Sequence, residues 1–218
     1  IFTLIITRQL SPEEFGTWGV INGIIIYALV INPIINYWVT REIARGEKTG
    51  STAMISTGMF SIVGIFVFVL ASYIIGITSD ADLDVLLFAT FLIPVIFVYN
   101  SLEAISIGFK PQARSYTILL FEIIKIPLGL MFVYYLEMDV KGVILAILLA
   151  YFVSTIFLAF LARKQLQTKF KKKYLVKWIK MFWLPTYRTL PSSLAMSDVT
   201  VFTIITGSVV GVAYYTAA

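Results

Sequence analysis

The sequence predicts an all-α protein that crosses the membrane several times. Of its 218 residues, 59% are hydrophobic and only 13% are charged, and the mean hydropathy is +0.91. Soluble domains typically contain about 45–50% apolar and about 25% charged residues. Several apolar runs reach the length of about 20 residues that a membrane-spanning helix needs, and they lack the alternation of a β-barrel strand. These observations exclude a soluble enzyme, a disordered tail and a disulfide-rich scaffold.

The apolar runs give the predicted helices in chain order. The first, Ile1–Thr7, is too short to span a bilayer. Longer runs follow at Phe15–Val39, Ala53–Ile77, Val85–Phe109, Tyr116–Leu136 and Lys141–Ala162, with a more polar one at Met181–Thr206. The residues after Gly211 begin a further helix. Because the chain starts and stops within apolar segments, we expect a piece of a longer protein, cut inside a helix at both ends.

Local signals indicate how these helices start, bend and pack. The segment Ser11–Glu14, Ser-Pro-Glu-Glu, predicts a helix start with Ser as the N-cap, Pro in the first turn and acids near the positive end of the helix dipole. Pro33, Pro94 and Pro127 fall inside the runs, where each is expected to kink its helix. Small residues that predict close helix packing are Gly58, Ser61 and Gly64.

Lysine and arginine are distributed unevenly over the connections. The connections after Phe15–Val39, Val85–Phe109 and Lys141–Ala162 hold 13 of the 17 cations. These are Arg41, Arg45, Lys48, Lys110, Arg114, Arg163, Lys164, Lys169, Lys171, Lys172, Lys173, Lys177 and Lys180. The other connections hold Arg8 and Lys141. By the positive-inside rule, the basic connections are predicted to face the cytoplasm of a multi-pass protein in the cell membrane.

Residues 163–180 form the longest and most basic connection. Apolar residues recur at helical spacing between its lysines and just beyond them; they are Phe170, Tyr174, Leu175, Trp178, Ile179 and Phe182. This pattern is typical of an amphipathic helix at the cytoplasmic interface, with its lysines near anionic lipid head groups. A basic anchor that only fixes the topology gives the same pattern. We do not expect nucleic-acid binding, because the sequence offers no soluble domain to carry it.

Ionisable and amide side chains inside the apolar runs are the candidate functional residues, because such groups usually face a cavity or one another. The ionisable ones are Glu103, Glu122, Lys125, Arg188 and Asp198, and the amides include Asn22, Asn32, Asn36 and Asn100. Glu122 and Lys125 are three residues apart and share a helix face. Two interpretations stay open. One is a polar cavity lined by several helices, and the other is a structural role through internal pairs and hydrogen bonds between helices.

Catalytic signatures are absent from the sequence. It contains no histidine and no cysteine, which excludes a Ser-His-Asp triad and the usual zinc and haem sites. Nucleotide-binding and hydrolase motifs are also absent. Asp80 and Asp82 have the DxD spacing of some membrane transferases, but they lie on the predicted outer side. We therefore expect no enzyme activity, no metal and no cofactor.

Two parts of the sequence resemble a known transporter family. The first extends from Thr7-Arg8-Gln9-Leu10-Ser11-Pro12-Glu13-Glu14-Phe15-Gly16-Thr17-Trp18 to Thr40-Arg41-Glu42-Ile43-Ala44-Arg45-Gly46-Glu47. It is similar to the opening A-R-x-L-G-P-E-x-F-G-x-Y … R-E-I-A-R of polysaccharide biosynthesis (Wzx-type) flippases, with Ser11 in place of Gly and Trp18 in place of Tyr. The second resembles the seventh-helix signature of the family and comprises Pro185, Asp198–Gly207 and Val212-Ala213-Tyr214-Tyr215-Thr216-Ala217-Ala218.

The resemblance implies the multidrug/oligosaccharidyl-lipid/polysaccharide (MOP) exporter fold, with two six-helix lobes around a central cavity. Residues 1–162 would form the N-terminal lobe with a truncated first helix, 163–180 a cytoplasmic linker, and 181–218 the start of the C-terminal lobe. The implied function is a flippase that moves an isoprenoid-diphosphate-linked oligosaccharide from the cytoplasmic to the outer leaflet by alternating access. Its implied partners are this surface-polysaccharide repeat unit, membrane lipids, and a glycan polymerase or glycosyltransferases.

The diphosphate of such a substrate needs cationic partners, and arginine suits bidentate phosphate contact. The resemblance therefore implies substrate-binding roles for Arg8, Arg41, Lys125, Arg188 and Asn36. The alternative is a multidrug/cation antiporter of the same superfamily, with a coupling carboxylate at Glu103, Glu122 or Asp198. A scaffold without transport is disfavoured by the charges inside the spans.

Overall fold

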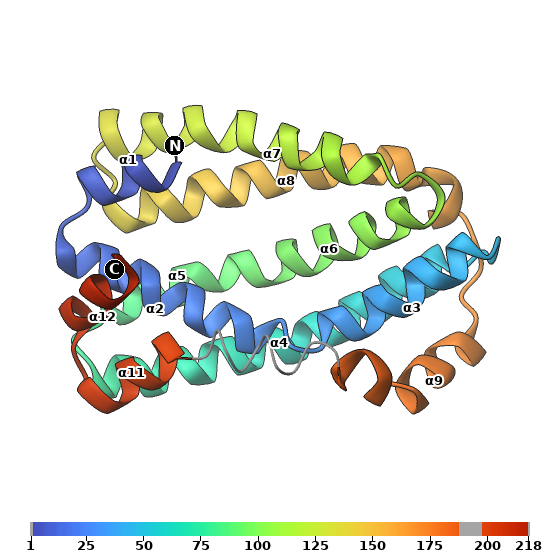
Figure 1. Ribbon diagram of the computed structural model, residues 1–218, viewed down its shortest axis with the longest axis horizontal. Helices are drawn as coiled ribbons and strands as arrows, with labels where there is room; N and C mark the ends of the chain where they lie inside the picture. Colours follow the sequence, from blue (N-terminus) through green and yellow to red (C-terminus); the bar gives the residue numbers. More distant parts are fainter. Residues whose placement is uncertain (1, 188–197, 218) are drawn as a thin grey trace.

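The structure is a computed structural model that describes residues 2–187 and 198–217, and no β-strand occurs within these two ranges. Its elements are α1 (Phe2–Gln9), α2 (Pro12–Ala28), α3 (Asn32–Ala44), α4 (Gly50–Thr78), α5 (Leu83–Phe88), η1 (Ala89–Phe91), α6 (Leu92–Phe109), α7 (Ala113–Gly129), η2 (Leu130–Tyr135), α8 (Asp139–Leu166), α9 (Lys172–Lys180), α11 (Asp198–Thr206) and α12 (Val209–Ala217). The long helices lie side by side along one axis (Figure 1).

Within residues 2–187 and 198–217, four helical segments are long and apolar enough to cross a membrane. They are Gly50–Thr78, Leu83–Phe109, Ala113–Tyr135 and Asp139–Leu166, and α2 with α3 gives a fifth if this bent pair is one span. These segments correspond to the first five predicted spans. The all-helical fold class is therefore confirmed for the described residues. The predicted span Met181–Thr206 is described only at its two ends.

The predicted helix Phe15–Val39 is broken rather than merely kinked. α2 and α3 meet at an angle of 55°, and Pro33 lies in the first turn of α3. Proline has no backbone N–H to donate, so it fits a first turn better than a helix interior. α3 also continues to Ala44, which places Arg41 on a helix rather than in a connection.

The other sequence signals have mixed outcomes. Ser11 and Glu14 form the predicted capping box, because each side chain accepts a hydrogen bond from the backbone N–H of the other residue, at 3.3 and 2.7 Å. Pro94 lies just after the short η1 turn, and Pro127 precedes the π-helical segment η2. Gly64 packs against α2 and α6 as predicted, but Gly58 is exposed and faces open space.

The connections sort by charge into two ends of the bundle (Figure 1). The end that holds the connections after α3, α6 and α8, together with α9, carries the predicted basic connections and is called the basic end. The other end holds the α1–α2, α4–α5, α7–α8 and α11–α12 connections and is called the acidic end. A small cavity there is lined by Glu13, Glu14, Thr17, Asp80, Asp82, Val85, Met138, Asp139, Val140 and Lys141. The grouping agrees with the predicted topology, and the cytoplasmic assignment of the basic end stays a prediction.

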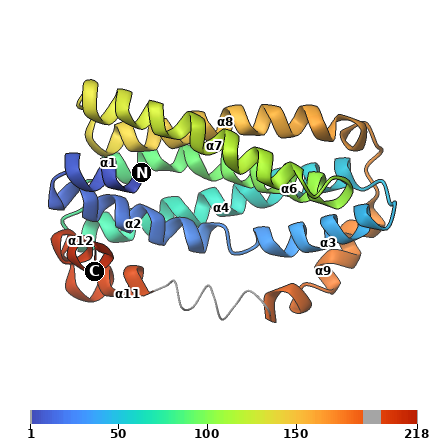
Figure 2. The same ribbon diagram turned by 45° about the horizontal axis from the view of Figure 1, so that its top comes forward.

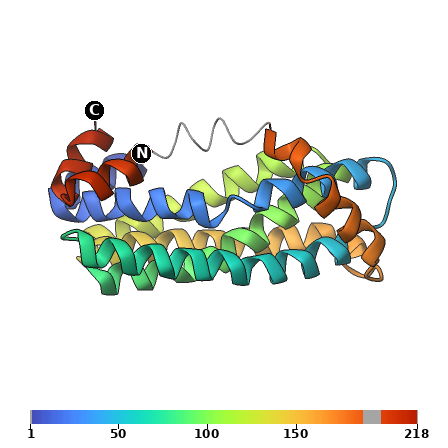
Figure 3. The same cartoon turned by 90° about the horizontal axis from the view of Figure 1, so that it is seen from below.

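Two apolar clusters hold the bundle together. The larger cluster includes fully buried residues such as Ile24, Phe68 and Phe97 from α2, α4 and α6. The second lies toward the basic end and includes Trp38 of α3 and Trp178 of α9. Figure 3 shows α9, in orange, against the basic end of the bundle. The predicted interfacial helix is therefore also part of the protein core.

The helices that follow residue 197 return to the acidic end. α12 lies alongside α2, beside the capping-box turn (Figure 2). Gly16 allows the closest approach, because a Cβ atom there would lie only 2.0 Å from the carbonyl oxygen of Val209. Asp80 of the α4–α5 connection donates its backbone N–H to the carbonyl of Gly207 at 3.3 Å. These contacts hold α12 and the α11–α12 connection against α2 and the α4–α5 connection at the acidic end.

Candidate functional site

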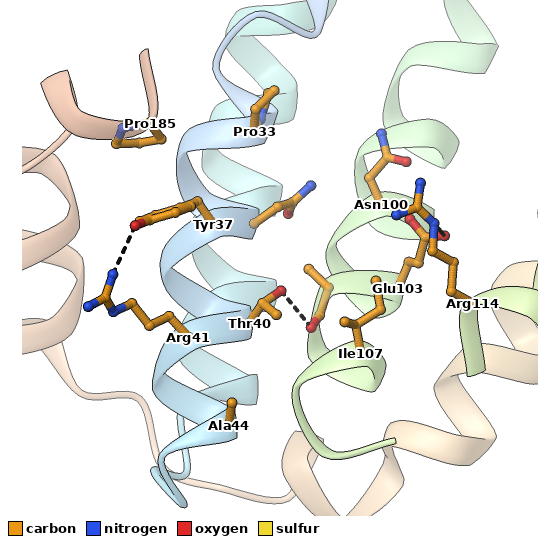
Figure 4. Close-up of a pocket in the computed structure, with 12 residues that line it drawn as sticks. Pro33, Tyr37, Thr40, Arg41, Ala44, Asn100, Glu103, Ile107, Arg114 and Pro185 are labelled. Carbon is orange, nitrogen blue, oxygen red and sulfur yellow. Dashed lines mark hydrogen bonds and ion pairs between the residues drawn. The ribbon is translucent and has the colours of Figure 1, made fainter. Parts of the chain in front are cut away.

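A cavity of about 830 Å³, with polar side chains among its lining residues, lies between α3, α6 and the start of α7. Figure 4 shows the side chains around it. Its lining residues are Pro33, Asn36, Tyr37, Thr40, Arg41, Ala44, Asn100, Glu103, Ala104, Ile107, Arg114 and Pro185. We call it the basic-end cavity. It is larger than the cavity at the acidic end, which has a volume of about 300 Å³.

One wall of the basic-end cavity is α3. The helical spacing of Asn36, Tyr37, Thr40 and Arg41 brings all four side chains to it. Arg41 donates from Nη1 to the hydroxyl oxygen of Tyr37 at 2.9 Å, and Thr40 donates to the carbonyl of Ala104 at 3.0 Å. The Asn36 Oδ1 atom is buried without a hydrogen-bond partner among the described residues. Arg41 is exposed, so its guanidinium is accessible to a ligand.

The other wall combines α6 with the first turn of α7. Glu103 and Asn100 come from α6, and Arg114 reaches back from α7 (Figure 4). The Arg114 Nε atom lies 3.8 Å from Glu103 Oε1. The Glu103 side chain is 19% exposed and that of Arg114 is 64% exposed. The carboxylate is thus sheltered, while the guanidinium is accessible from the basic end.

This arrangement is suited to binding rather than to bond-breaking chemistry. Arg41 and Arg114 supply two cations, Glu103 supplies one carboxylate, and the remaining polar lining groups are neutral. Guanidinium groups pair well with phosphate and carboxylate oxygens, and amide and hydroxyl groups suit sugar hydroxyls. Among the described residues, no group of three or more acidic side chains is placed to hold a metal ion.

Sequence reasoning missed three of the polar lining residues. Arg114 was assigned only to a basic connection, and Tyr37 and Thr40 were not singled out. The helical spacing of Tyr37 with Arg41 is a signal in the sequence that can identify Tyr37 and Thr40 as lining residues. Nothing in the sequence indicated that Arg114 faces Glu103, because that contact depends on how α6 and α7 pack.

The predicted site residue Lys125 lies in a different cavity. This second cavity, of about 330 Å³, is lined by apolar residues together with Thr3, Trp18, Asn22, Lys125 and Tyr151. Lys125 Nζ lies 2.5 Å from Glu122 Oε1 and 5.0 and 4.7 Å from the ring centres of Phe2 and Phe121. The expected pairing of Glu122 with Lys125 is therefore present. Glu122 lines neither this cavity nor the basic-end cavity.

The remaining predicted site residues lie apart from these cavities or cannot be placed. Arg8 is exposed near the end of α1 and lines neither cavity. Arg188 lies outside the described residues. Asp198 is the first residue of α11. The structure thus brings together Asn36, Arg41 and Glu103 from the predicted set and separates Arg8 and Lys125 from them.

Comparison with known proteins identifies the fold. No family model matches the sequence, and no curated protein matches it. A MOP superfamily transporter from Pyrococcus furiosus, described for the reverse polarity of its binding pocket, has a TM-score of 0.66, 18% identity and coverage of 92% of this chain and 49% of that chain. A proline-to-alanine mutant of a MATE protein has a TM-score of 0.67 and 20% identity, covering 99% of this chain and 55% of that one.

A third solved structure agrees with these two. It is an outward-facing multidrug resistance MATE family transporter of the MOP superfamily, with a TM-score of 0.66 and 21% identity, covering 100% of this chain and 55% of that chain. The chain therefore has the fold of one part of a two-lobe helical exporter and spans about half the length of these transporters. The likeness is to the superfamily fold, and the structural matches do not single out the polysaccharide flippases.

Proposed function

We propose that the protein is a membrane transporter whose basic-end cavity binds an anionic, phosphate-bearing substrate. The observation that supports this proposal is that Arg41, Arg114 and several neutral hydrogen-bonding groups line one cavity of about 830 Å³. The motif resemblance narrows the substrate to an isoprenoid-diphosphate-linked oligosaccharide. The diphosphate would pair with the guanidinium groups, while the sugars would contact the asparagine, tyrosine and threonine side chains.

The direction of transport follows from the two ends of the bundle. The basic end carries most of the cations and is assigned to the cytoplasm by the positive-inside rule. The cavity lies toward this end, while α12 packs closely on α2 at the acidic end. We therefore expect the substrate to load from the cytoplasmic side and to leave when the α2–α12 contact opens. Since flipping breaks no bond, no catalytic residue is required.

The second candidate function is a multidrug/cation antiporter. It is favoured by Glu103, a sheltered carboxylate in the same cavity. In an antiporter this carboxylate would alternate between a coupling cation and the transported drug. In the flippase, its main role would be to orient Arg114. The two proposals differ in the substrate that accumulates when the protein is removed.

The test uses the full-length protein in its own host. Deleting the gene is expected to make lipid-linked oligosaccharide accumulate in the cytoplasmic leaflet and to deplete surface glycan. Restoring the gene with Arg41→Ala and Arg114→Ala together should leave export at least about tenfold below the unmodified gene, because two charge-assisted phosphate contacts are lost. Lipid extraction with mass spectrometry measures the intermediate, and glycan staining measures the product.

Arg45→Ala is the matched control for this experiment. Arg45 is an exposed arginine at the end of α3, one turn beyond Arg41, and it does not line the cavity. Its removal should leave export unchanged. Normal surface glycan in the double arginine variant would contradict the proposed site. Drug hypersensitivity with normal glycan in the deletion strain would instead favour the antiporter.

A further inference from the structure

Helix α9 contacts α3, the second helix of the bent α2–α3 pair, which forms one wall of the basic-end cavity. Glu42 of α3 is buried, with 5% of its side chain exposed, and its Oε1 atom lies 2.6 Å from Lys177 Nζ of α9. Lys177 Nζ also lies 6.0 Å from the ring centre of Trp38, one helical turn before Glu42. A buried carboxylate is costly without a partner, so this ion pair ties α3 specifically to α9.

A second contact joins α9 to the connection that follows α3. The Tyr174 hydroxyl donates to Glu47 Oε2 at 2.5 Å. The Tyr174 ring and Trp178 are both buried, with 6% and 1% of each residue exposed. Lys171, just before α9, donates its backbone N–H to Thr52 Oγ1 at 3.0 Å. α9 is therefore fixed to α3, to its following connection and to the start of α4.

The residues that contact α9 lie next to those that face the cavity. Glu42 follows Arg41 directly, so the two side chains leave α3 about 100° apart. α3 is separated from α2 by the 55° bend and from α4 by a short connection, so neither neighbour continues its helix. The chain beyond α9 leads to Pro185, which lines the same cavity (Figure 4). α9 thus contacts the α3 wall of the cavity, and the chain that follows α9 supplies another lining residue.

We propose that Lys177 and Glu42 are positioning residues, and that their ion pair holds α3 in the orientation that presents Asn36 and Arg41 to the cavity. On this proposal, the basic connection between the lobes does more than fix topology or contact lipid, because it sets the shape of the binding site. Only its consequence for transport rests on the proposed function. The geometric claim is tested without any substrate.

The test measures the accessibility of two cavity walls by cysteine labelling. The 218 residues contain no cysteine, so single cysteines can be placed in the full-length protein once any cysteines outside this segment are replaced. Asn36→Cys reports on the α3 wall and Asn100→Cys on the α6 wall. Each is labelled in purified protein with a soluble maleimide, with and without Lys177→Met.

Lys177→Met is expected to change the labelling rate of the cysteine at position 36 severalfold and to leave that at position 100 unchanged. Adding Glu42→Gln should leave the rate at position 36 changed, because the ion pair is still absent. A return to the starting rate would overturn the proposal, since it would show that only the unpaired buried carboxylate had disturbed α3. Lys180→Met is the matched control, since Lys180 is an exposed lysine at the end of the same helix, and it should change neither rate.

An unchanged labelling rate at position 36 would overturn the proposal, because it would show that the ion pair does not position α3. Equal changes at positions 36 and 100 would also overturn it, because they would show that the whole protein had become less rigid. If Lys177→Met yields no folded protein, the exchanged pair Glu42→Lys with Lys177→Glu decides the question. Folded protein with the original labelling rates supports the proposal, and any other result overturns it.

Discussion

Tyr174 and Glu47 show how one hydrogen bond responds to pH. The bond from the Tyr174 hydroxyl lowers the pKa of Glu47 below its ordinary value of 4.5, with help from nearby lysines. The same bond, with burial, raises the pKa of Tyr174 to about 12. A carboxylate with a lowered pKa stabilises the folded protein above its ordinary pKa, and this contribution is lost as the pH falls through the lowered value.

Tyr174→Phe keeps the ring and removes only the hydroxyl. It is expected to lower the melting temperature of the purified protein at neutral pH, because the hydrogen bond to Glu47 is lost. The difference from the unmodified protein should shrink as the pH falls below 4.5 and through the lowered pKa of Glu47, where the carboxylate of the folded protein becomes protonated. Thermal unfolding in detergent at several pH values measures this. A difference that stays constant into the acid range would show that the stabilisation does not depend on the Glu47 charge.

At the scale of single elements, hydropathy predicted where helices lie but not where they break. The run Phe15–Val39 was predicted as one helix because its apolar character is nearly continuous. The α2–α3 bend and the extension of α3 to Ala44 depend on tertiary contacts, including the cover that α9 gives to Glu42. The apolar spacing of α9 was likewise visible in the sequence, whereas the surface it packs against was not.

The candidate site was predictable in part for the same reason. Asn36 and Glu103 are predicted as polar residues within apolar runs, and Arg41 is predicted through the family resemblance. The structure places all three around one cavity. Their roles in binding stay predictions. Lys125 is predicted on the same grounds but lines a different cavity, because the position of a side chain along a helix does not reveal which of two cavities it lines.

The packing of α2 on α12 gives a prediction for one element pair. Gly16→Ala should destabilise the protein by about 1–3 kcal/mol, because its Cβ atom would meet the Val209 carbonyl and the helices must move apart. Gly58→Ala is the matched control on α4, where a Cβ atom meets nothing within 4 Å. It should be neutral or slightly stabilising, since alanine favours helix. Equal melting temperatures for the two variants would contradict the close contact.

At the scale of the whole molecule, α12 packs on α2 at the acidic end, and the cavity of about 830 Å³ lies toward the basic end. Gly19 lies opposite Val212, where a Cβ atom at position 19 would be 3.0 Å from Val212 Cγ1. If transport requires this contact to open, locking it should stop transport without unfolding the protein.

Gly19→Cys with Val212→Cys is expected to form a disulfide under mild oxidation in the full-length protein. Export should fall on oxidation and return on reduction, while each single-cysteine variant stays insensitive. Gel mobility after proteolysis measures the cross-link, and surface glycan measures export. Undiminished export with complete cross-linking would show that the α2–α12 contact need not separate.

The two arginines in the basic-end cavity have a consequence for the energy source of export. Under the proposed function, with the basic end in the cytoplasm, the phosphate-bearing head group would move to the outer leaflet without electrical opposition, because the interior of a cell is negative. Each negative charge that crosses 100 mV outward releases about 2.3 kcal/mol. A flippase of this design would use the membrane potential directly as its energy source. Glu103 would then orient Arg114 and would not need to bind a coupling ion.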